Sequence, residues 1–249
     1  MISPHNKNLV AFREVEKTPL IPPERDAGTR EGNYRTWKGV PHAELIKGIV
    51  SAAKRAKLQP QKSRQYILMR NGSEMLATVP MGVPESGIQP YLGVVSSNSR
   101  RKCLTFYVGG TIEDVPLVVD FFGGVRNFPS WEYVEGFNIA SVCDEAISIW
   151  KERIERELEI RLNELVDMPL SDSDARLIIM DAATKGLTSY ASIGGIWKWW
   201  ENRKGKTGFD LLSAFTNCWS ASDSFLQLEQ LCKFQNLIVP TLNRKKVLV

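Results

Sequence analysis

The chain of 249 residues is poor in the side chains that usually build catalytic and metal sites. It has 2 histidines and 4 cysteines, and no two cysteines have the Cys-x-x-Cys spacing of zinc or redox motifs. A histidine-based nucleophile triad or a multi-histidine metal site is therefore hard to assemble. We predict no catalytic residues, no metal site and no cofactor.

The few cysteines and histidines have structural interpretations. Cys143 and Cys218 lie in apolar helical patterns, where a free cysteine behaves as a small hydrophobe. We predict that all four cysteines are free thiols in a reducing setting. His42 stands at the beginning of a predicted helix, where we expect it to face solvent rather than to act in catalysis.

Long apolar runs and phosphate-binding loops are also missing. No apolar run approaches the roughly 20 residues that cross a bilayer, and the first residues carry charges where a signal peptide is apolar. We therefore expect a cytoplasmic protein without membrane contact. Gly205-Lys206-Thr207 resembles the end of a phosphate-binding loop, but Trp200 stands where the first glycine of that loop would be.

What the sequence does contain is the composition of a globular protein, with 43% hydrophobic and 24% charged residues. Residues 1–38 hold several prolines and little periodicity, so we expect an extended N-terminal arm. Residues 39–137 are predicted to form a basic helix and an antiparallel sheet. Residues 138–249 are predicted to form a long helix and a helical tail that pack with 39–137 as one domain.

Five short runs with strand character follow the first helix. Asn71-Gly72 between the first two runs predicts a hairpin turn, and Gly109-Gly110 is interpreted as a turn between strands. The runs cover residues 65–69, 74–79, 91–95, 104–108 and 115–122.

Apolar residues then recur at helical spacing. The predicted helices cover residues 139–166, 174–185, 190–203 and 209–235. Grouped strands followed by grouped helices indicate an α+β fold: a helix, a five-stranded antiparallel meander, a long helix packed on the sheet and a helical C-terminal tail.

The basic residues are unevenly distributed. Residues 1–130 hold 18 Lys+Arg against 11 Asp+Glu, whereas residues 131–249 hold 14 against 17. Ten basic and two acidic residues lie between Lys47 and Lys102. If the first helix and the hairpin ends come together, they form a positive surface suited to phosphate contacts.

This surface is the predicted nucleic-acid-binding site. A single strand would also require an aromatic stacking surface. Trp199 is the candidate, because Trp197 and Trp200 share one side of their helix whereas Trp199 points elsewhere. The predicted contact residues are Lys54, Arg55, Arg64, Arg70, Arg100, Arg101, Lys102, Trp199 and Arg203.

Several segments together resemble a phage- and plasmid-borne family known only as a domain of unknown function. The likeness rests on residues 41–46 at a helix start, 93–99 at a strand end, Gly109-Gly110 at a hairpin, a long charged helix, and 209–217 near the end. It covers about residues 35–235. The family's Asn-Ser-His-Asp-like loop is replaced here by Arg100-Arg101. The resemblance implies a mobile-element context.

Three functions stay open at this point. The first is a non-enzymatic nucleic-acid-binding protein of a phage or plasmid, which binds or anneals single-stranded DNA and forms a homo-oligomer. The alternative is a protein-interaction factor that inhibits a host defence or regulatory protein. A third is an enzyme that uses a divalent metal, with Asp114, Asp120 and Asp144 as the carboxylates that could converge.

Overall fold

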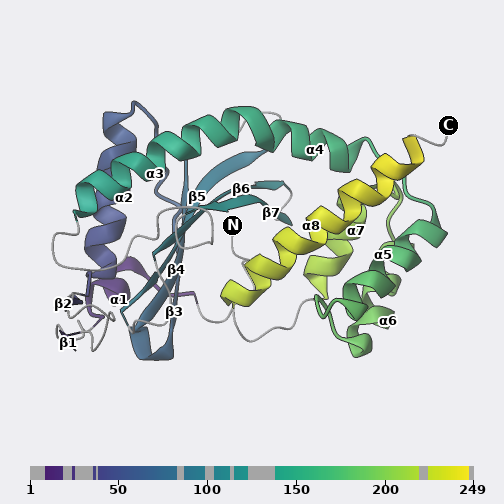
Figure 1. Cartoon of the computed structure of the whole chain (residues 1–249), viewed down its shortest axis with the longest axis horizontal. Helices are drawn as coiled ribbons and strands as arrows, with labels where there is room; N and C mark the ends of the chain where they lie inside the picture. The colour runs from purple at the N-terminus through teal and green to yellow at the C-terminus, as the bar shows by residue number, and fades with distance from the viewer. Residues whose placement is uncertain are drawn as a thin grey trace, which may run out of the picture. The chain divides into compact units, whose positions relative to one another are not determined.

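A computed structural model describes most of the chain. The described residues are 9–18, 24–25, 36–37, 39–82, 87–98, 104–112, 115–122, 138–218 and 224–246. The elements can be followed in chain order in Figure 1. Within the described residues, no helix combines the length and the apolar composition that a membrane span requires.

The first half of the chain builds a sheet. Two short strands, β1 (Glu24–Arg25) and β2 (Thr36–Trp37), pair with each other. The main sheet has the strand order β3-β4-β5-β6-β7, and its registers from β3 to β6 are antiparallel. Its strands are β3 (Gln65–Met69), β4 (Glu74–Pro80), β5 (Gln89–Ser97), β6 (Thr105–Ile112) and β7 (Val115–Phe122).

Helices precede and follow this sheet. Two come first, α1 (Phe12–Glu16) and α2 (His42–Arg55). After the sheet come α3 (Ile139–Arg153), a π-helical turn (Ile154–Leu158), α4 (Glu159–Val166), α5 (Asp172–Thr184), α6 (Ile193–Glu201), α7 (Gly208–Asn217) and α8 (Ser224–Lys246). This arrangement confirms the predicted α+β class, with a helical C-terminal region.

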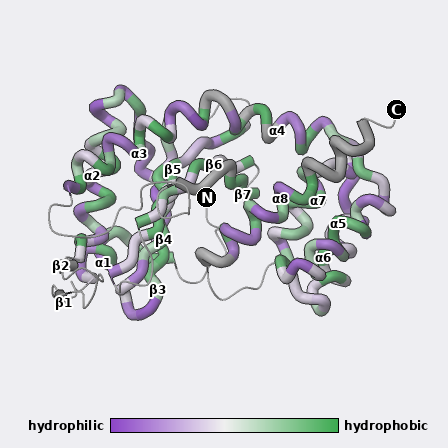
Figure 2. The backbone as a smooth tube through the Cα atoms, viewed as in Figure 1, coloured by the Kyte–Doolittle hydropathy of each residue, from purple (hydrophilic) through white to green (hydrophobic). Residues whose placement is uncertain are grey.

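The helices α2 and α3 pack against each other and bury apolar side chains. In α2, Leu45, Ile46 and Ile49 follow three- and four-residue spacing and are fully buried. In α3, the indole of Trp150 donates to the carbonyl oxygen of Tyr91 in β5, at 2.9 Å. Figure 2 shows the result, with apolar residues along the central strands and alternating polar and apolar residues along α2 and α3.

One glycine inside the sheet has a packing role. Gly93 of β5 pairs with Tyr107 of β6, and a Cβ atom at residue 93 would lie 1.8 Å from Cζ of Tyr107. The Tyr107 ring therefore occupies the space that any larger residue at position 93 would need.

Four sequence predictions need correction at the level of single elements. Residues 12–16 of the predicted extended arm form α1, because Val15 is buried and Phe12 lies 5.5 Å from Tyr66 between ring centroids. Gly109-Gly110 lies within β6, where it pairs with β5, and is not a turn. The predicted helix 209–235 consists of α7 and the first part of α8. The predicted long helix 139–166 contains the π-helical turn.

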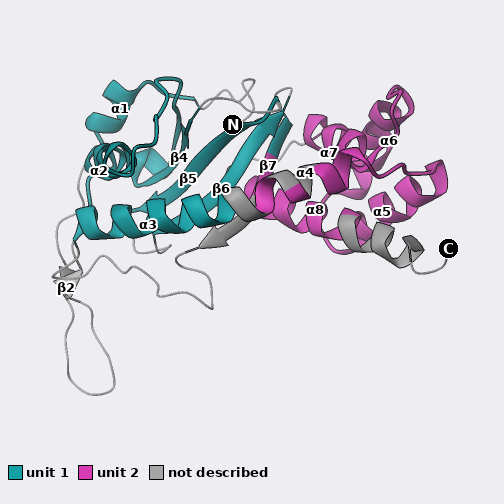
Figure 3. Ribbon diagram, turned by 90° about the horizontal axis from the view of Figure 1, so that it is seen from above, with its two compact units in different colours: residues 1–116, 120–154 teal, residues 117–119, 155–249 magenta. Residues whose placement is uncertain are grey.

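The chain divides into two compact units, which Figure 3 shows in different colours. Unit 1 comprises residues 1–116 and 120–154, and unit 2 comprises residues 117–119 and 155–249. This division falls inside the long helical segment, at the beginning of the π-helical turn, whereas the predicted boundary lies between residues 137 and 138.

Unit 2 is held by capped helices and an aromatic core. Ser171 and Thr207 each form a capping box at the beginning of α5 and α7, which satisfies backbone donors that a helix leaves free. The rings of Phe215 and Phe234 stack at 3.8 Å between centroids. Trp200 is fully buried.

Candidate nucleic-acid interface

Between Glu44 in α2 and Glu74 in β4, the chain has no acidic residue and seven basic ones. This segment runs along α2, through the connection that follows it, and along β3. All seven side chains belong to unit 1, so they share one structural body. The question for binding is which of these positive charges are already neutralised within the protein.

Three of the seven are engaged in ion pairs. Lys47 Nζ lies 2.8 Å from Glu16 Oε1, and Arg55 Nη2 lies 2.6 Å from Asp144 Oδ1. The third is Arg70, whose Nε lies 3.1 Å from Oε1 of the buried Glu74. Arg55 and Arg70 were predicted to contact phosphates, and in the structure each has a carboxylate partner within the protein.

The other four cations have no carboxylate partner in the part of the chain that the structure describes. They are Lys54, Lys57, Lys62 and Arg64, which lie within eleven consecutive residues. We call this segment, residues 54–64, the basic connection, because it joins the end of α2 to the beginning of β3. The three lysines are exposed and Arg64 is half-buried.

The backbone of the basic connection is unusual at Lys57. Its φ is +60°, in the left-handed region that favours glycine. The amide of Lys57 donates to the carbonyl oxygen of Lys54, and the amide of Leu58 donates to that of Ala53. These are the two hydrogen bonds of a Schellman motif, in which the left-handed residue is usually glycine. A lysine therefore occupies a position that costs about 1–2 kcal/mol for a residue with a Cβ.

Two of the predicted contacts, Arg64 and Arg70, lie apart along one strand. Arg64 and Arg70 flank the two ends of β3, and a strand of this length separates them by roughly 20 Å. Arg100, Arg101 and Lys102 lie outside the described residues. The basic connection is thus the part of the predicted surface that the structure brings together.

The two predicted contacts in unit 2 differ from each other. The exposed fraction of Trp199 is 44%, whereas Trp200 is buried and donates to Oδ1 of Asp172 at 3.1 Å. Trp199 and Trp200 thus differ in exposure, although they are adjacent on α6. Arg203 is half-buried, and its Nη2 donates to Oγ of Ser213 at 2.6 Å, so part of its guanidinium is already engaged.

The prediction that His42 faces solvent is wrong. Its side chain is fully buried and contacts Gly72, in the turn between β3 and β4, and Ser96 in β5. Because the carbonyl oxygen of Gly72 can only accept, Nε2 donates to it at 3.1 Å, and the neutral ring then accepts from Oγ of Ser96 at its Nδ1, at 3.0 Å. Burial lowers the pKa of His42 to about 4, although the Gly72 hydrogen bond acts in the opposite direction. His42 therefore has a structural role, because its hydrogen bonds connect the beginning of α2 to the sheet.

The carboxylates proposed for a metal do not form a site among the described residues. Asp144 pairs with Arg55, while Asp114 and the side chain of Asp120 lie outside what the structure describes. Across the described ranges, no group of three or more histidine, cysteine, aspartate or glutamate residues could hold a metal ion. Cys143, Cys218 and Cys232 are free thiols, and Cys103 lies outside the described ranges.

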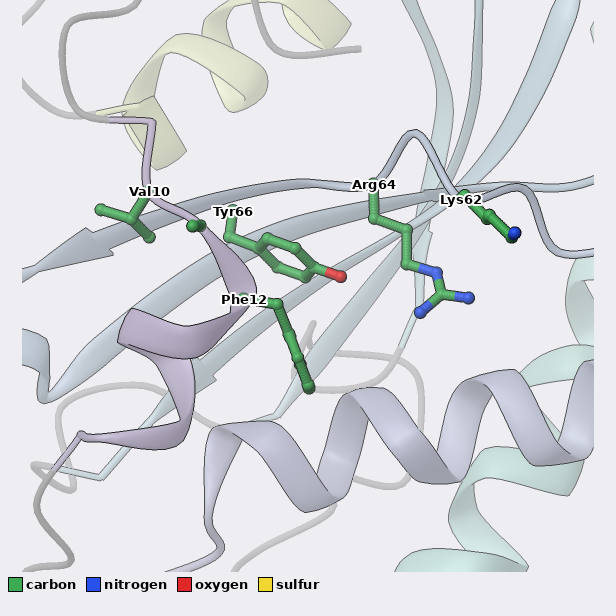
Figure 4. A pocket seen from close by; sticks show the side chains of 6 residues that line it. Val10, Phe12, Lys62, Arg64 and Tyr66 are labelled. Atoms are coloured by element: carbon green, nitrogen blue, oxygen red, sulfur yellow. The ribbon is translucent and has the colours of Figure 1, made fainter.

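An aromatic pocket that was not predicted from the sequence lies beside the basic connection. It has a volume of about 330 Å³ and combines Phe12 and Tyr66 with Lys62 and Arg64. In Figure 4 the hydroxyl of Tyr66 is directed toward the guanidinium of Arg64, and Phe12 lies on the α1 side. The spacing Phe12-x-x-Val15 was the available sign that residues 12–16 form a packed helix. Nothing in the spacing indicated that this helix would lie against β3.

Comparisons with protein-family models, with curated proteins and with solved structures find no match for the chain. The family resemblance described above therefore stays a prediction.

Proposed function

We propose that the chain binds nucleic acid through the basic connection. The observation that carries this proposal is that, within unit 1, some basic side chains form ion pairs with carboxylates and others have no described carboxylate partner. Lys47, Arg55 and Arg70 have internal carboxylate partners, whereas no such partner is described for Lys54, Lys57, Lys62 or Arg64. When clustered cations without carboxylate partners contact phosphates, they displace the counterions that are condensed on the nucleic acid. The release of these counterions supplies most of the affinity in non-specific nucleic-acid binding.

The strained backbone of Lys57 supports the same proposal. A glycine at this position would fit the left-handed conformation without strain, and yet the position carries a positive charge on an exposed side chain. Residues held in an unfavourable conformation are often found at functional sites. Contact between the Lys57 ammonium group and a phosphate would account for a lysine here.

Single-stranded DNA is the preferred ligand, because aromatic rings accompany the cations. Single-strand binders combine a positive track with rings on which bases stack. Phe12 and Tyr66 line the pocket that also contains Lys62 and Arg64. Since one basic connection spans only a few phosphates, we expect several copies to act together. A cytoplasmic location and a phage or plasmid origin complete this proposal.

The test is a binding assay on matched variants. The basic-connection variant carries Lys54→Gln, Lys57→Gln and Lys62→Gln, and the control variant carries Lys151→Gln, Lys185→Gln and Lys233→Gln. All six lysines are exposed, so both variants lose three positive charges. Fluorescence anisotropy with a labelled single strand of 20 nucleotides measures the dissociation constant at low salt.

We expect the basic-connection variant to bind at least about tenfold more weakly than the control variant, since each lost phosphate contact weakens binding across all sequences. Duplex DNA and RNA of the same length, measured in parallel, establish which nucleic acid is preferred. Equal affinities of the two variants would remove the proposed site. If the wild-type chain does not bind at low salt, the proposed function is wrong.

A second candidate is protein interaction, which the exposed apolar side chains of unit 2 favour. The exposed fractions are 67% for Leu177, 47% for Met180 and 63% for Tyr190. Leu177 and Met180 are three residues apart on α5 and therefore share a face. Exposed apolar patches often mark interaction sites, and a host defence or regulatory protein would be the partner.

This second candidate has its own test. A host protein that is retained by the wild type and lost from a Leu177→Asp, Met180→Asp variant would support an interaction through α5. Retention of the same proteins by both would count against it.

A further inference from the structure

The pocket beside the basic connection is formed where the segment before α1 meets the beginning of β3. Its volume is about 330 Å³, which is at the lower end of the range for small-molecule sites. That size suits one nucleotide rather than a peptide or a duplex. Its lining residues are Val10, Ala11, Phe12, Lys62, Arg64 and Tyr66.

One side of the pocket is aromatic and fixed in place. The rings of Phe12 and Tyr66 lie 5.5 Å apart between centroids, at an angle of 45°. The amide of Val10 donates to the carbonyl oxygen of Tyr66 at 3.0 Å. This backbone hydrogen bond holds the segment just before Phe12 against β3. The half-buried Phe12 presents an apolar surface to the pocket.

The other side of the pocket is cationic. Nε of Arg64 donates to the carbonyl oxygen of Gln61 at 3.1 Å. Burial raises the pKa of the Tyr66 hydroxyl, while the charge and a hydrogen bond of Arg64 act in the opposite direction. The Gln61 hydrogen bond engages only Nε of the guanidinium, which has five N–H donors in total. Donors therefore remain for a ligand, and none of the described residues that line the pocket is acidic.

We propose that this pocket binds a nucleoside phosphate, with the base against Phe12 and the phosphate at Arg64 and Lys62. The aromatic side of the pocket complements a planar base, and the cationic side complements an anionic phosphate. The nucleotide is either free or the phosphorylated end of a strand. The inference deepens the proposed function, because Lys62 and Arg64 also belong to the basic connection.

Isothermal titration calorimetry with deoxyadenosine 5′-monophosphate tests the pocket directly. Deoxyadenosine and inorganic phosphate serve as the two halves of the ligand. We expect the monophosphate to bind at least about tenfold more tightly than either half, because hydrogen bonds to charged groups contribute roughly tenfold or more. Equal affinity for inorganic phosphate would overturn the inference, since the aromatic wall would then contribute nothing.

Variants locate the site. Arg64→Gln should weaken binding of the monophosphate at least about tenfold. Arg176→Gln, which changes an arginine that lies over the Trp197 ring in unit 2, should leave it unchanged. Circular dichroism shows whether Arg64→Gln is folded, and Lys62→Gln, at an exposed side chain, provides a second test if it is not. Unchanged affinity in both Arg64→Gln and Lys62→Gln would overturn the inference.

Strands with and without a 5′-phosphate distinguish the two sources of the ligand. A strand end as the ligand predicts tighter binding of the phosphorylated strand, and a free nucleotide predicts no difference between the strands. If a single strand binds through the lysines while the monophosphate does not bind, the pocket inference is wrong and the proposed function stands. If the monophosphate binds and no strand does, the proposed function is wrong.

Discussion

Replacement of Lys57 by glycine should strengthen the fold and weaken nucleic-acid binding at the same time. The φ of +60° at this residue costs about 1–2 kcal/mol for a side chain with a Cβ. Glycine removes this cost, but it adds about 0.5–1 kcal/mol of unfolded-state entropy. The expected net gain in the free energy of unfolding is about 0.5–1 kcal/mol, which corresponds to an increase in Tm of roughly 1–4 °C for a chain of this size.

The comparison with Lys57→Ala separates the two effects. Alanine loses the same charge and keeps the backbone strain, so it should bind nucleic acid as weakly as the glycine variant without the gain in stability. Thermal unfolding followed by circular dichroism and anisotropy with a labelled single strand measure the two quantities. A destabilised Lys57→Gly variant would refute the backbone reasoning. A glycine variant with wild-type affinity would show that the Lys57 ammonium group does not contact the strand.

Three further predictions concern the core of unit 1. The pKa of His42 is about 4 in the folded chain and 6.5 in the unfolded chain, so the unfolded state takes up the proton first as the pH falls, and the free energy of unfolding decreases by about 3 kcal/mol between pH 6.5 and 4. In urea unfolding, the free energies of the wild type and of His42→Gln should therefore change differently with pH over this range. The same pH dependence in both would contradict the assignment. Gly93→Ala should cost about 1–3 kcal/mol or more because its Cβ meets the Tyr107 ring, and adding Tyr107→Leu should recover part of the loss in the same urea assay. Burial raises the pKa of Cys143 to about 12, so peptide mapping should find it unmodified by iodoacetamide at pH 8 unless the chain is first unfolded.

The fold was largely predictable because its elements carry strong local patterns. The alternation and turn residues around Asn71-Gly72 predicted the β3–β4 hairpin, and the structure places residues 70–72 at positive φ values there. The helix predicted over residues 174–185 is α5, and Ser171 forms a capping box at its beginning. Gly109-Gly110 misled the prediction, because glycine inside a strand and glycine in a turn look alike in sequence. Its place in β6 depends on pairing with β5.

The candidate site was harder to predict, because it depends on which charges meet a partner. Nothing local distinguishes Arg55, which pairs with Asp144 from α3, from Lys54 beside it. The burial of His42 likewise depends on Ser96, 54 residues away in sequence. Phe12 becomes part of a pocket only because α1 returns to β3. Such long-range pairings are set by the tertiary fold and are not visible in spacing or composition.

The dependence of single-strand affinity on salt tests the central claim most directly. For the wild type and the control variant, the logarithm of the association constant should fall linearly with the logarithm of the salt concentration. Each phosphate contact on a single strand contributes a slope of about −0.7, so loss of Lys54, Lys57 and Lys62 should make the slope shallower by about 2. A slope that is the same in the basic-connection variant and the control variant would show that the strand does not bind at residues 54–64.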